Sequence, residues 1–304
     1  MAQKNSNLHA AKAAKNDEFY TRLEDIENEL KHYKSFFNGK TVYCNCDDPK
    51  ESNFFKFFSM NFENYGLKKL ITTGYNENGH GYLYIYEGDR NGNRMVDDNE
   101  IQVVELQGDG DFRSEECIQY LKESDVVVTN PPFSMFREYV KQLMDYDKNF
   151  LVIGNKNAIT YKEIFPYIKN NQLWIGITSP NEFKTPNGEI TKSVSGLCRW
   201  FTNIPHAKRN QPLDLYKKYN PTDYPKYDNY DAINVDKVTD IPEDYEGVMG
   251  VPVTFLDKFC PTQFEIVGIS NHYEMAGIPY SNNNCYCEIN GNRKYVRIFI
   301  KKVS

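Results

Sequence analysis

The stretch Asp125-Val-Val-Val-Thr-Asn-Pro-Pro-Phe133 decides the fold class of this chain. Three consecutive valines are typical of a short strand covered on both faces, as in a parallel sheet with helices on each side. At its carboxyl end the strand runs directly into Asn130-Pro131-Pro132-Phe133. Ligands of open α/β sheets bind beyond the carboxyl ends of the strands, so this turn is the first candidate for a functional site.

Outward from this stretch, apolar runs alternate with segments of helical periodicity. Strands are predicted at 41–46, 68–73, 150–153 and 197–204, and helices at 25–37, 53–60, 115–122, 136–144 and 161–169. A turn-rich segment at about 75–107 interrupts the alternation and predicts an inserted hairpin. The pattern indicates one α/β domain over residues 16–204.

Two regions flank this domain. Residues 1–15 show no apolar period and predict a flexible, basic N-terminal arm. From Pro205 onward prolines and tyrosines dominate and the helical periodicity disappears, with a strand-like segment at 295–301. We therefore expect a second, irregular region over residues 205–304.

Composition excludes several classes of protein. No run of 18 apolar residues occurs in the 304, and the first residues lack the apolar core of a signal peptide, so we expect a cytoplasmic protein with no membrane span. Seven scattered cysteines do not form a disulfide framework. A net charge of −6 excludes a uniformly basic polyanion binder but leaves room for a local basic groove.

The residue types of the Asn130–Phe133 turn are suited to a reaction in which an amine acts as the nucleophile. An exocyclic amine on an aromatic ring is a poor nucleophile, because its lone pair is delocalised into the ring. Acceptors for its two N–H groups draw it toward tetrahedral geometry, and Asn130 and Pro131 offer a carboxamide and a carbonyl oxygen. Pro132 stiffens the turn, and Phe133 offers a flat face for a planar base. The alternative is a stiff strand-to-helix turn with a capping asparagine.

This motif resembles that of amino-group methyltransferases that use S-adenosylmethionine, and the wider sequence resembles the EcoRI-type adenine-specific DNA methyltransferases. Six stretches carry the resemblance: Asn16-Asp-Glu-Phe-Tyr-Thr21, Cys46-Asp-Asp-Pro49 with Ser52-Asn-Phe-Phe55, Gly108-Asp-Gly-Asp-Phe-Arg113, Asn130-Pro-Pro-Phe133, Trp200-Phe-Thr-Asn203 and Val248-Met-Gly-Val-Pro-Val-Thr-Phe255. The resemblance implies a Rossmann-like methyltransferase fold, followed by a target-recognition region that binds DNA.

The resemblance also assigns residues to the cofactor, S-adenosylmethionine. The predicted cofactor residues lie in three segments: Phe19, Tyr20 and Thr21; Cys46, Asp47, Asp48 and Pro49; and Asp111 and Phe112. In the second segment a carboxylate would hold the methionine ammonium, with the choice between the two aspartates open and no Gly-x-Gly present. In the third segment, the carboxylate of Asp111 would accept a hydrogen bond from the amino group of the cofactor adenine. The alternative is that this segment is a plain turn. An acid for the ribose is missing at the expected place, with Glu77 the nearest candidate.

No metal site is expected. The spacing of Asp89, Asn91, Asn93, Asp97 and Glu100 matches a calcium loop, but Arg94 stands where such a loop needs glycine, so a solvated hairpin tip is preferred. The pairs of cysteines spaced by two offer too few ligands for zinc, and the histidines show no ligand spacing.

DNA contacts are predicted in the second region, where basic residues are interleaved with tyrosines such as Tyr216, Tyr219, Tyr224, Tyr227 and Tyr295. The basic candidates are Lys208, Arg209, Lys217, Lys218, Arg293, Lys294 and Arg297. A basic surface that contacts only solvent would show the same sequence pattern.

Together these features predict a monomeric, site-specific enzyme that methylates N6 of a flipped adenine in duplex DNA. The predicted biological role is the modification half of a restriction-modification system, with a cognate restriction endonuclease that forms no stable complex with it. The alternatives are methylation of guanine N2 in RNA or of a protein glutamine, and a DNA-binding relative without catalysis.

Overall fold

The computed structural model describes residues 20–46, 48–76, 79–184, 190–191, 196–279 and 285–303. The chain forms two compact units, one of Met1–Ala158 with Gly176–Ile204 and the other of Ile159–Ile175 with Pro205–Ser304. The boundary at residue 204 coincides with the predicted one. Residues 159–175 differ from the prediction, because they belong to the second unit.

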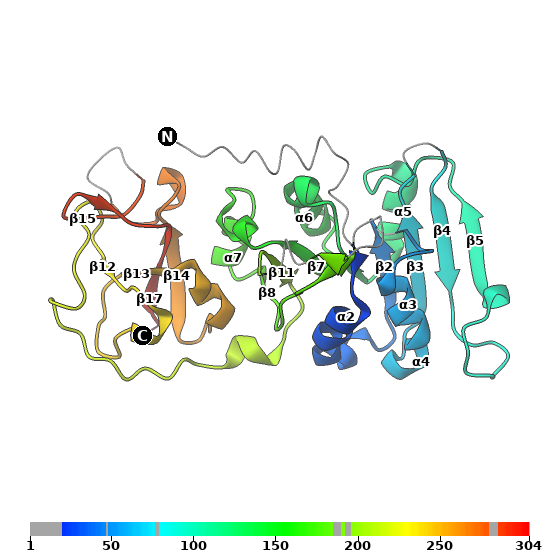
Figure 1. Ribbon diagram of the computed structural model, residues 1–304, viewed down its shortest axis with the longest axis horizontal. Helices are drawn as coiled ribbons and strands as arrows, with labels where there is room; N and C mark the ends of the chain where they lie inside the picture. Colours follow the sequence, from blue (N-terminus) through cyan, green and yellow to red (C-terminus); the bar gives the residue numbers. More distant parts are fainter. Residues whose placement is uncertain are drawn as a thin grey trace. The chain divides into compact units, whose positions relative to one another are not determined.

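The first unit is built on a mixed sheet (Figure 1) with the order β5-β4-β3-β2-β6-β7-β11. The strands are β2 (Thr41–Asn45), β3 (Lys69–Gly74), β4 (Tyr82–Tyr86), β5 (Ile101–Glu105), β6 (Val126–Thr129), β7 (Asn149–Asn155) and β11 (Cys198–Thr202). Strands β3, β2, β6 and β7 are parallel to one another, whereas β4, β5 and β11 pair antiparallel with their neighbours. The Rossmann-like fold and the inserted hairpin are as predicted.

Helices cover both faces of this sheet. They are α2 (Leu23–Leu30), α3 (Asn53–Met60), α4 (Phe62–Tyr65), α5 (Glu115–Glu123) and α6 (Phe136–Asp145), with 3₁₀ turns η1 (Lys31–Phe37), η2 (Asp98–Glu100), η3 (Phe133–Met135) and η4 (Lys156–Thr160). Val42 and Val128 join a core with phenylalanines of α3, while α5 and α6 pack on the sheet. The predicted helix 25–37 is α-helical only to Leu30 and continues as η1.

A short three-stranded sheet completes this unit, with β1 (Tyr20–Thr21), β9 (Phe183–Lys184) and β10 (Ile190–Thr191) in the order β1-β9-β10. At the hairpin tip, the Asp89 carboxylate accepts from the backbone N–H groups of Gly92 and Arg94, both at 2.6 Å, and these bonds lower its pKa. Arg94 takes the left-handed conformation, with φ 61°, at the position where a calcium loop needs glycine. No group of three His, Cys, Asp or Glu side chains arranged as metal ligands occurs among the described residues.

The second unit contains a sheet that the sequence analysis missed, so the description of this region as irregular was wrong. Its strands, in sheet order, are β12 (Ile233–Asn234), β13 (Met249–Pro252), β17 (Arg297–Lys302) and β14 (Phe264–Ile269). Outside it lie β8 (Trp174–Ile175), β15 (Glu288–Ile289), β16 (Asn292–Arg293), α7 (Phe165–Lys169), η5 (Ala207–Asn210), η6 (Val238–Asp240), η7 (Val253–Lys258) and η8 (Tyr273–Met275). Most of these elements are too short for a readable period, which hides them in the sequence.

Long-range packing explains why residues 159–175 belong to this unit. Helix α7 packs against β14, and β8 against η7. A hydrophobic cluster that includes Tyr227, Tyr230 and Phe299 forms another part of the core. None of the helices in the described part of the chain is long and apolar enough to cross a membrane.

Candidate active site

The carboxyl ends of β2 and β6 lie side by side at the switch point of the sheet. After β2 the chain passes through α3 to β3 on one side, whereas α5 leads to β6 on the other side of β2. Open α/β sheets bind ligands at such a point. The sheet therefore brings the segment after Asn45 next to the segment after Thr129.

The asparagine of the turn after β6 is buried. Asn130 is 7% exposed and Pro131 is buried. Pro132 has an extended ψ of 125°, and its carbonyl accepts from Met135 N–H at 3.0 Å, which starts η3. Phe133 is half-buried and packs against the core of the first unit. The prolines thus delay the following helix until the chain has left the strand.

The loop after β2 reverses through Cys46, which has a left-handed φ of 68°. Pro49 is buried, and one carboxylate oxygen of Asp48 accepts from Lys50 N–H at 2.9 Å. Asp47, the other predicted carboxylate, lies outside the described residues. Ser52 then caps α3, because its Oγ accepts from Phe54 N–H at 3.1 Å.

The N-terminal motif lies against the start of α3. Phe19 is outside the described residues, and Tyr20 and Thr21 form β1. The side-chain amide of Asn53 donates to the carbonyl of Thr21 at 2.7 Å. A hydrogen bond therefore joins the N-terminal motif to the first residue of the helix that follows the predicted cofactor loop.

The third predicted segment is pressed against the end of β3. Gly110 has a left-handed φ of 83°, and a Cβ placed on it would lie 2.3 Å from the carbonyl oxygen of Gly74. The backbone N–H of Asn76 donates to the carbonyl of Asp109 at 2.8 Å. This segment is a turn, but one with a close backbone contact that requires glycine.

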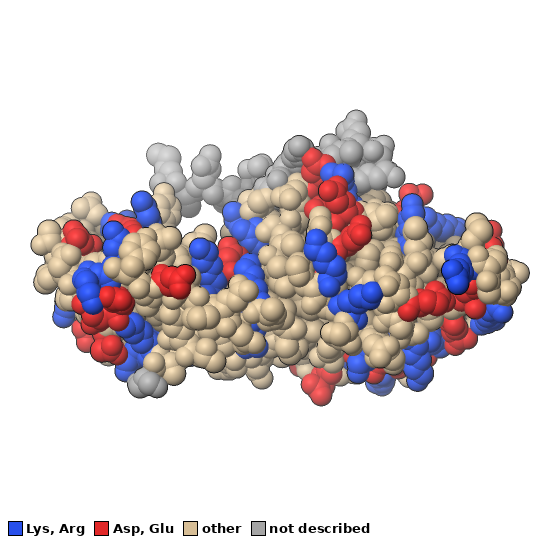
Figure 2. Space-filling view, turned by 90° about the horizontal axis from the view of Figure 1, so that it is seen from below, with Lys and Arg blue, Asp and Glu red and all other residues tan. Residues whose placement is uncertain are grey.

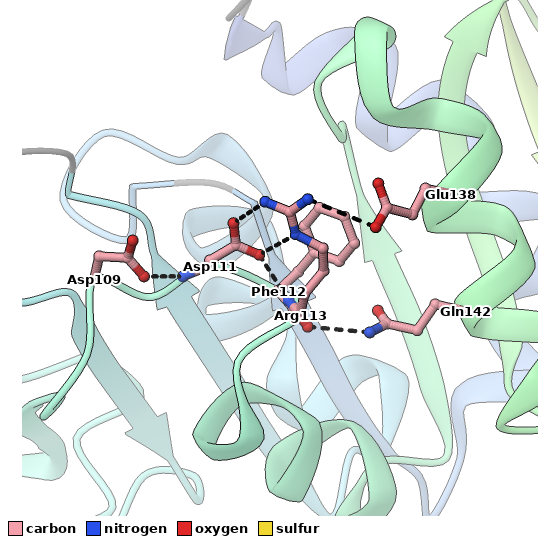
Figure 3. A network of polar contacts seen from close by, with 6 residues as sticks. All are labelled: Asp109, Asp111, Phe112, Arg113, Glu138 and Gln142. Carbon is pink, nitrogen blue, oxygen red and sulfur yellow. Dashed lines mark hydrogen bonds and ion pairs between the residues drawn. The ribbon is translucent and has the colours of Figure 1, made fainter.

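Arg113 holds the Asp111 carboxylate (Figure 3). One carboxylate oxygen accepts from the backbone N–H and from Nε of Arg113, at 2.8 and 2.9 Å, and the other accepts from Nη2 at 2.6 Å. The guanidinium keeps the pKa of Asp111 below its usual value. Arg113 also approaches Glu138 of α6 at 3.6 Å. This partner was not predicted from the sequence, although Arg113 is the last residue of the Gly108–Arg113 stretch.

Phe112 is buried beneath this pair, at 5% exposure. Its ring meets the ring of Tyr139 edge to face, with centroids 5.0 Å apart. Its carbonyl accepts from Nε2 of Gln142 at 3.3 Å (Figure 3). Both partners belong to α6, so the third segment is fixed to the helix that follows the Asn130 turn.

Two buried polar atoms near these segments are consistent with a polar cofactor. Within the described part of the chain, Oγ1 of Thr21 and Nδ2 of Asn45 have no hydrogen-bond partner. Thr21 is 2% and Asn45 1% exposed. Unsatisfied buried polar groups are costly and need an explanation, and a polar ligand bound at these strand ends would provide one.

Comparison with known proteins decides the family. The family model described as adenine-specific methyltransferase EcoRI matches residues 7–303. The chain belongs to this family. It is 48% identical to the Type II methyltransferase M.EcoRI of Escherichia coli, over 98% of this chain and 96% of that relative. No solved structure shows a significant match.

Two Mycoplasma relatives extend the comparison. The chain is 39% identical to the Type II methyltransferase M.MgeORF184P of Mycoplasma genitalium and 40% identical to M.MpnI of Mycoplasma pneumoniae. Each match covers 97% of this chain and 98% of the relative. The chain is thus an adenine-specific methyltransferase of the EcoRI family over nearly its whole length.

The predicted DNA-binding residues of this methyltransferase differ in exposure. Lys217 and Arg293 are exposed, whereas Lys208 and Lys294 are half-buried. Lys218 is exposed and pairs with Glu243 at 2.5 Å. On the face in Figure 2, Lys and Arg side chains lie among Asp and Glu side chains and form no continuous basic field.

Two arginines of this set are tied to the fold of the second unit. Arg297 is 7% exposed, and its Nε and Nη2 donate to Asn234 and Asp236 at 3.3 and 3.2 Å. Arg209 lies 3.5 Å from the ring centre of Trp174 and donates to the side chain of Asn171. The prediction that Arg297 contacts DNA is therefore withdrawn, because its guanidinium is buried in an internal network.

The tyrosines of the second unit also differ in exposure. Tyr224 and Tyr227 are buried, at 6% and 5% exposure, and Tyr219 packs against Tyr245 with ring centres 4.7 Å apart. Tyr216 and Tyr295, at 65% and 89%, are among the most exposed large side chains. Among the five tyrosines named in the sequence analysis, Tyr216 and Tyr295 therefore expose most of their surface to another molecule.

Proposed function

We propose that this methyltransferase transfers a methyl group from S-adenosylmethionine to N6 of an adenine in duplex DNA. The observation that carries the proposal is the buried Asn130, held by two prolines at the switch point of the sheet. A base inside a duplex cannot reach this position, so the target must be flipped out.

The target amine would lie against the turn. The Asn130 side-chain oxygen and the Pro131 carbonyl would accept its two N–H groups and localise the nitrogen lone pair. Phe133 would stack on the flipped ring. No strong base is required, because the nitrogen becomes acidic once it has attacked and its proton can pass to water.

The three segments at the strand ends would hold S-adenosylmethionine. Tyr20 and Thr21, with the predicted Phe19, would contact the methionine part, and Cys46, Asp48 and Pro49, with Asp47, would line the loop beside it. Asp111 and Phe112 would meet the adenine ring of the cofactor. When bound, the cofactor supplies a methyl group made electrophilic by its sulfonium.

DNA would be held by exposed cations and rings of the second unit. Lys217 and Arg293, together with Tyr216 and Tyr295, combine the charge and flat surface that nucleic acids require. Lys208, Arg209, Lys218 and Lys294 are secondary candidates. We propose a monomer that modifies DNA for a restriction-modification system, in which the endonuclease forms no stable complex with it.

The test is single-molecule sequencing of genomic DNA from a methylation-free host that expresses the protein. We expect N6-methyladenine in one sequence context, and none in a host that expresses Asn130→Ala. Calorimetric binding of S-adenosylmethionine to the purified variant would show that it is folded. Absence of the modified base in both hosts, with soluble protein, would contradict the DNA proposal and favour an RNA or protein acceptor.

A further inference from the structure

The segments proposed to form the active site meet at one buried pair of side chains, Asn45 and Tyr139. Asn45 is the last residue of β2 and Tyr139 lies in α6, at 1% and 0% exposure. The Tyr139 hydroxyl donates to the side-chain oxygen of Asn45. The end of β2 is thereby tied to the helix that follows the Asn130 turn.

A second bond ties the same strand end to the residue before the turn. Thr129 immediately precedes Asn130, and its Oγ1 donates to the backbone carbonyl of Asn45. The backbones of β2 and β6 pair at Val42 and Tyr43 of β2. The side-chain bond of Thr129 extends this contact to the ends of both strands. The catalytic turn is thus attached to Asn45 on both of its sides.

The third segment is attached through the same tyrosine. The Tyr139 ring packs against Phe112, and Gln142, one helical turn further on, donates to the Phe112 carbonyl. Tyr139 therefore contacts the residue that precedes the Cys46 loop and the ring of Phe112 in the third segment.

A purely structural role explains this pair poorly. Apolar side chains of similar size would fill the same space and leave no unsatisfied donor, whereas Asn45 leaves its Nδ2 without a partner within the described residues. With its side-chain oxygen occupied by Tyr139, Nδ2 is the group of Asn45 left to meet a ligand.

We propose that Asn45 and Tyr139 are positioning residues for methyl transfer. They set the position of the Asn130 turn relative to the loop that begins at Cys46, and so the approach of the target nitrogen to the methyl group. This inference rests on the proposed function. Displacements of about 1 Å at reacting atoms can slow a positioned reaction by orders of magnitude.

The structure offers a matched control in Tyr43. This tyrosine of β2 is equally buried, and its hydroxyl bonds to Oγ1 of Thr73 at 2.7 Å, outside the three segments. Tyr139→Phe and Tyr43→Phe each remove one buried hydroxyl and keep the ring. Any difference between them in the chemical step comes from where the hydroxyl acts.

The experiment measures three quantities for each variant: the unfolding midpoint in urea, the dissociation constants for S-adenosylmethionine and DNA, and the single-turnover rate at saturating concentrations of both. Tyr139→Phe is expected to slow the single turnover about tenfold, and Tyr43→Phe by less than about twofold, at similar losses of stability. Thr129→Val should slow the turnover as Tyr139→Phe does, and Thr129→Ser should restore it.

Equal single-turnover rates in Tyr139→Phe and Tyr43→Phe would overturn the inference and leave the pair a structural one. If Tyr139→Phe does not fold, the comparison of Thr129→Val with Thr129→Ser decides in its place. A wild-type protein that binds DNA but transfers no methyl group to it would refute the proposed function, and the inference with it.

Discussion

At the scale of single residues, Cys46 shows that the loop after β2, which is proposed to hold the cofactor, reverses without glycine. The sequence lacks Gly-x-Gly after the first strand, yet the chain still reverses there through a left-handed residue. A side chain in this conformation costs about 1–2 kcal/mol. Such strained residues concentrate at functional sites, which agrees with the proposed place of the cofactor.

The thiols give a direct test of that place. Cys46 and Cys285 are half-buried, whereas Cys198 and Cys287 are buried. Burial raises the pKa of Cys198 and that of Cys287 to about 12. At pH 8 these two stay protonated, because the pH lies far below their pKa, so iodoacetamide should leave them unmodified in the folded protein.

S-adenosylhomocysteine should slow the alkylation of Cys46 and leave that of Cys285 unchanged, as read by peptide mass spectrometry. Equal rates at Cys46 with and without the ligand would place the cofactor elsewhere.

At the scale of elements, the end of β3 and the Asp109–Phe112 turn depend on one glycine contact. In Gly110→Ala the new Cβ meets the Gly74 carbonyl in a left-handed backbone, and we expect a loss of about 2–5 kcal/mol in the free energy of unfolding. Gly92→Ala is the control, because Gly92 is also left-handed but nothing lies within 4 Å of its Cβ position.

Gly92→Ala should lower the free energy of unfolding in urea by about 1–2 kcal/mol, which is the cost of a side chain in a left-handed backbone. If the two variants lose the same stability, the close contact at Gly74 does not exist in solution.

Sequence periodicity predicted the longer strands and helices of the first unit because these have an apolar run or a clear helical face. It did not predict the short elements β1, α4, β9 and β10. The buried valines of β6 and the apolar face of α3 are visible within one segment. The partners of Asn45, Tyr139 and Arg113 were not predictable in this way. Tyr139 has the spacing of any core residue of a helix, and its hydroxyl bond to a strand more than 90 residues earlier depends on the tertiary fold.

At the scale of the whole molecule, the acidic balance of the chain makes a few exposed cations important for DNA binding. Lys217→Ala and Arg293→Ala should each lower the slope of log affinity against log salt by about 1, and weaken binding to all sequences alike. Fluorescence anisotropy with a short duplex at several salt concentrations measures this.

Arg297→Ala serves as the contrast. It should leave the salt slope unchanged and lower the free energy of unfolding by about 1–3 kcal/mol, since it removes a buried hydrogen bond to Asn234 and a partly buried one to Asp236. A change in the salt slope with unchanged stability would return Arg297 to the DNA-binding surface.

The path of the chain also bears on how the second unit could be exchanged between relatives. Ile159–Ile175 belongs to the second unit, although the chain on both sides of it belongs to the first. A single crossover at residue 204 would therefore give a hybrid in which α7 and β8 from one parent face β14 and η7 from the other. Hybrids with an intact second unit would have to inherit both stretches together, which makes recombination within this family a matter of two paired exchanges.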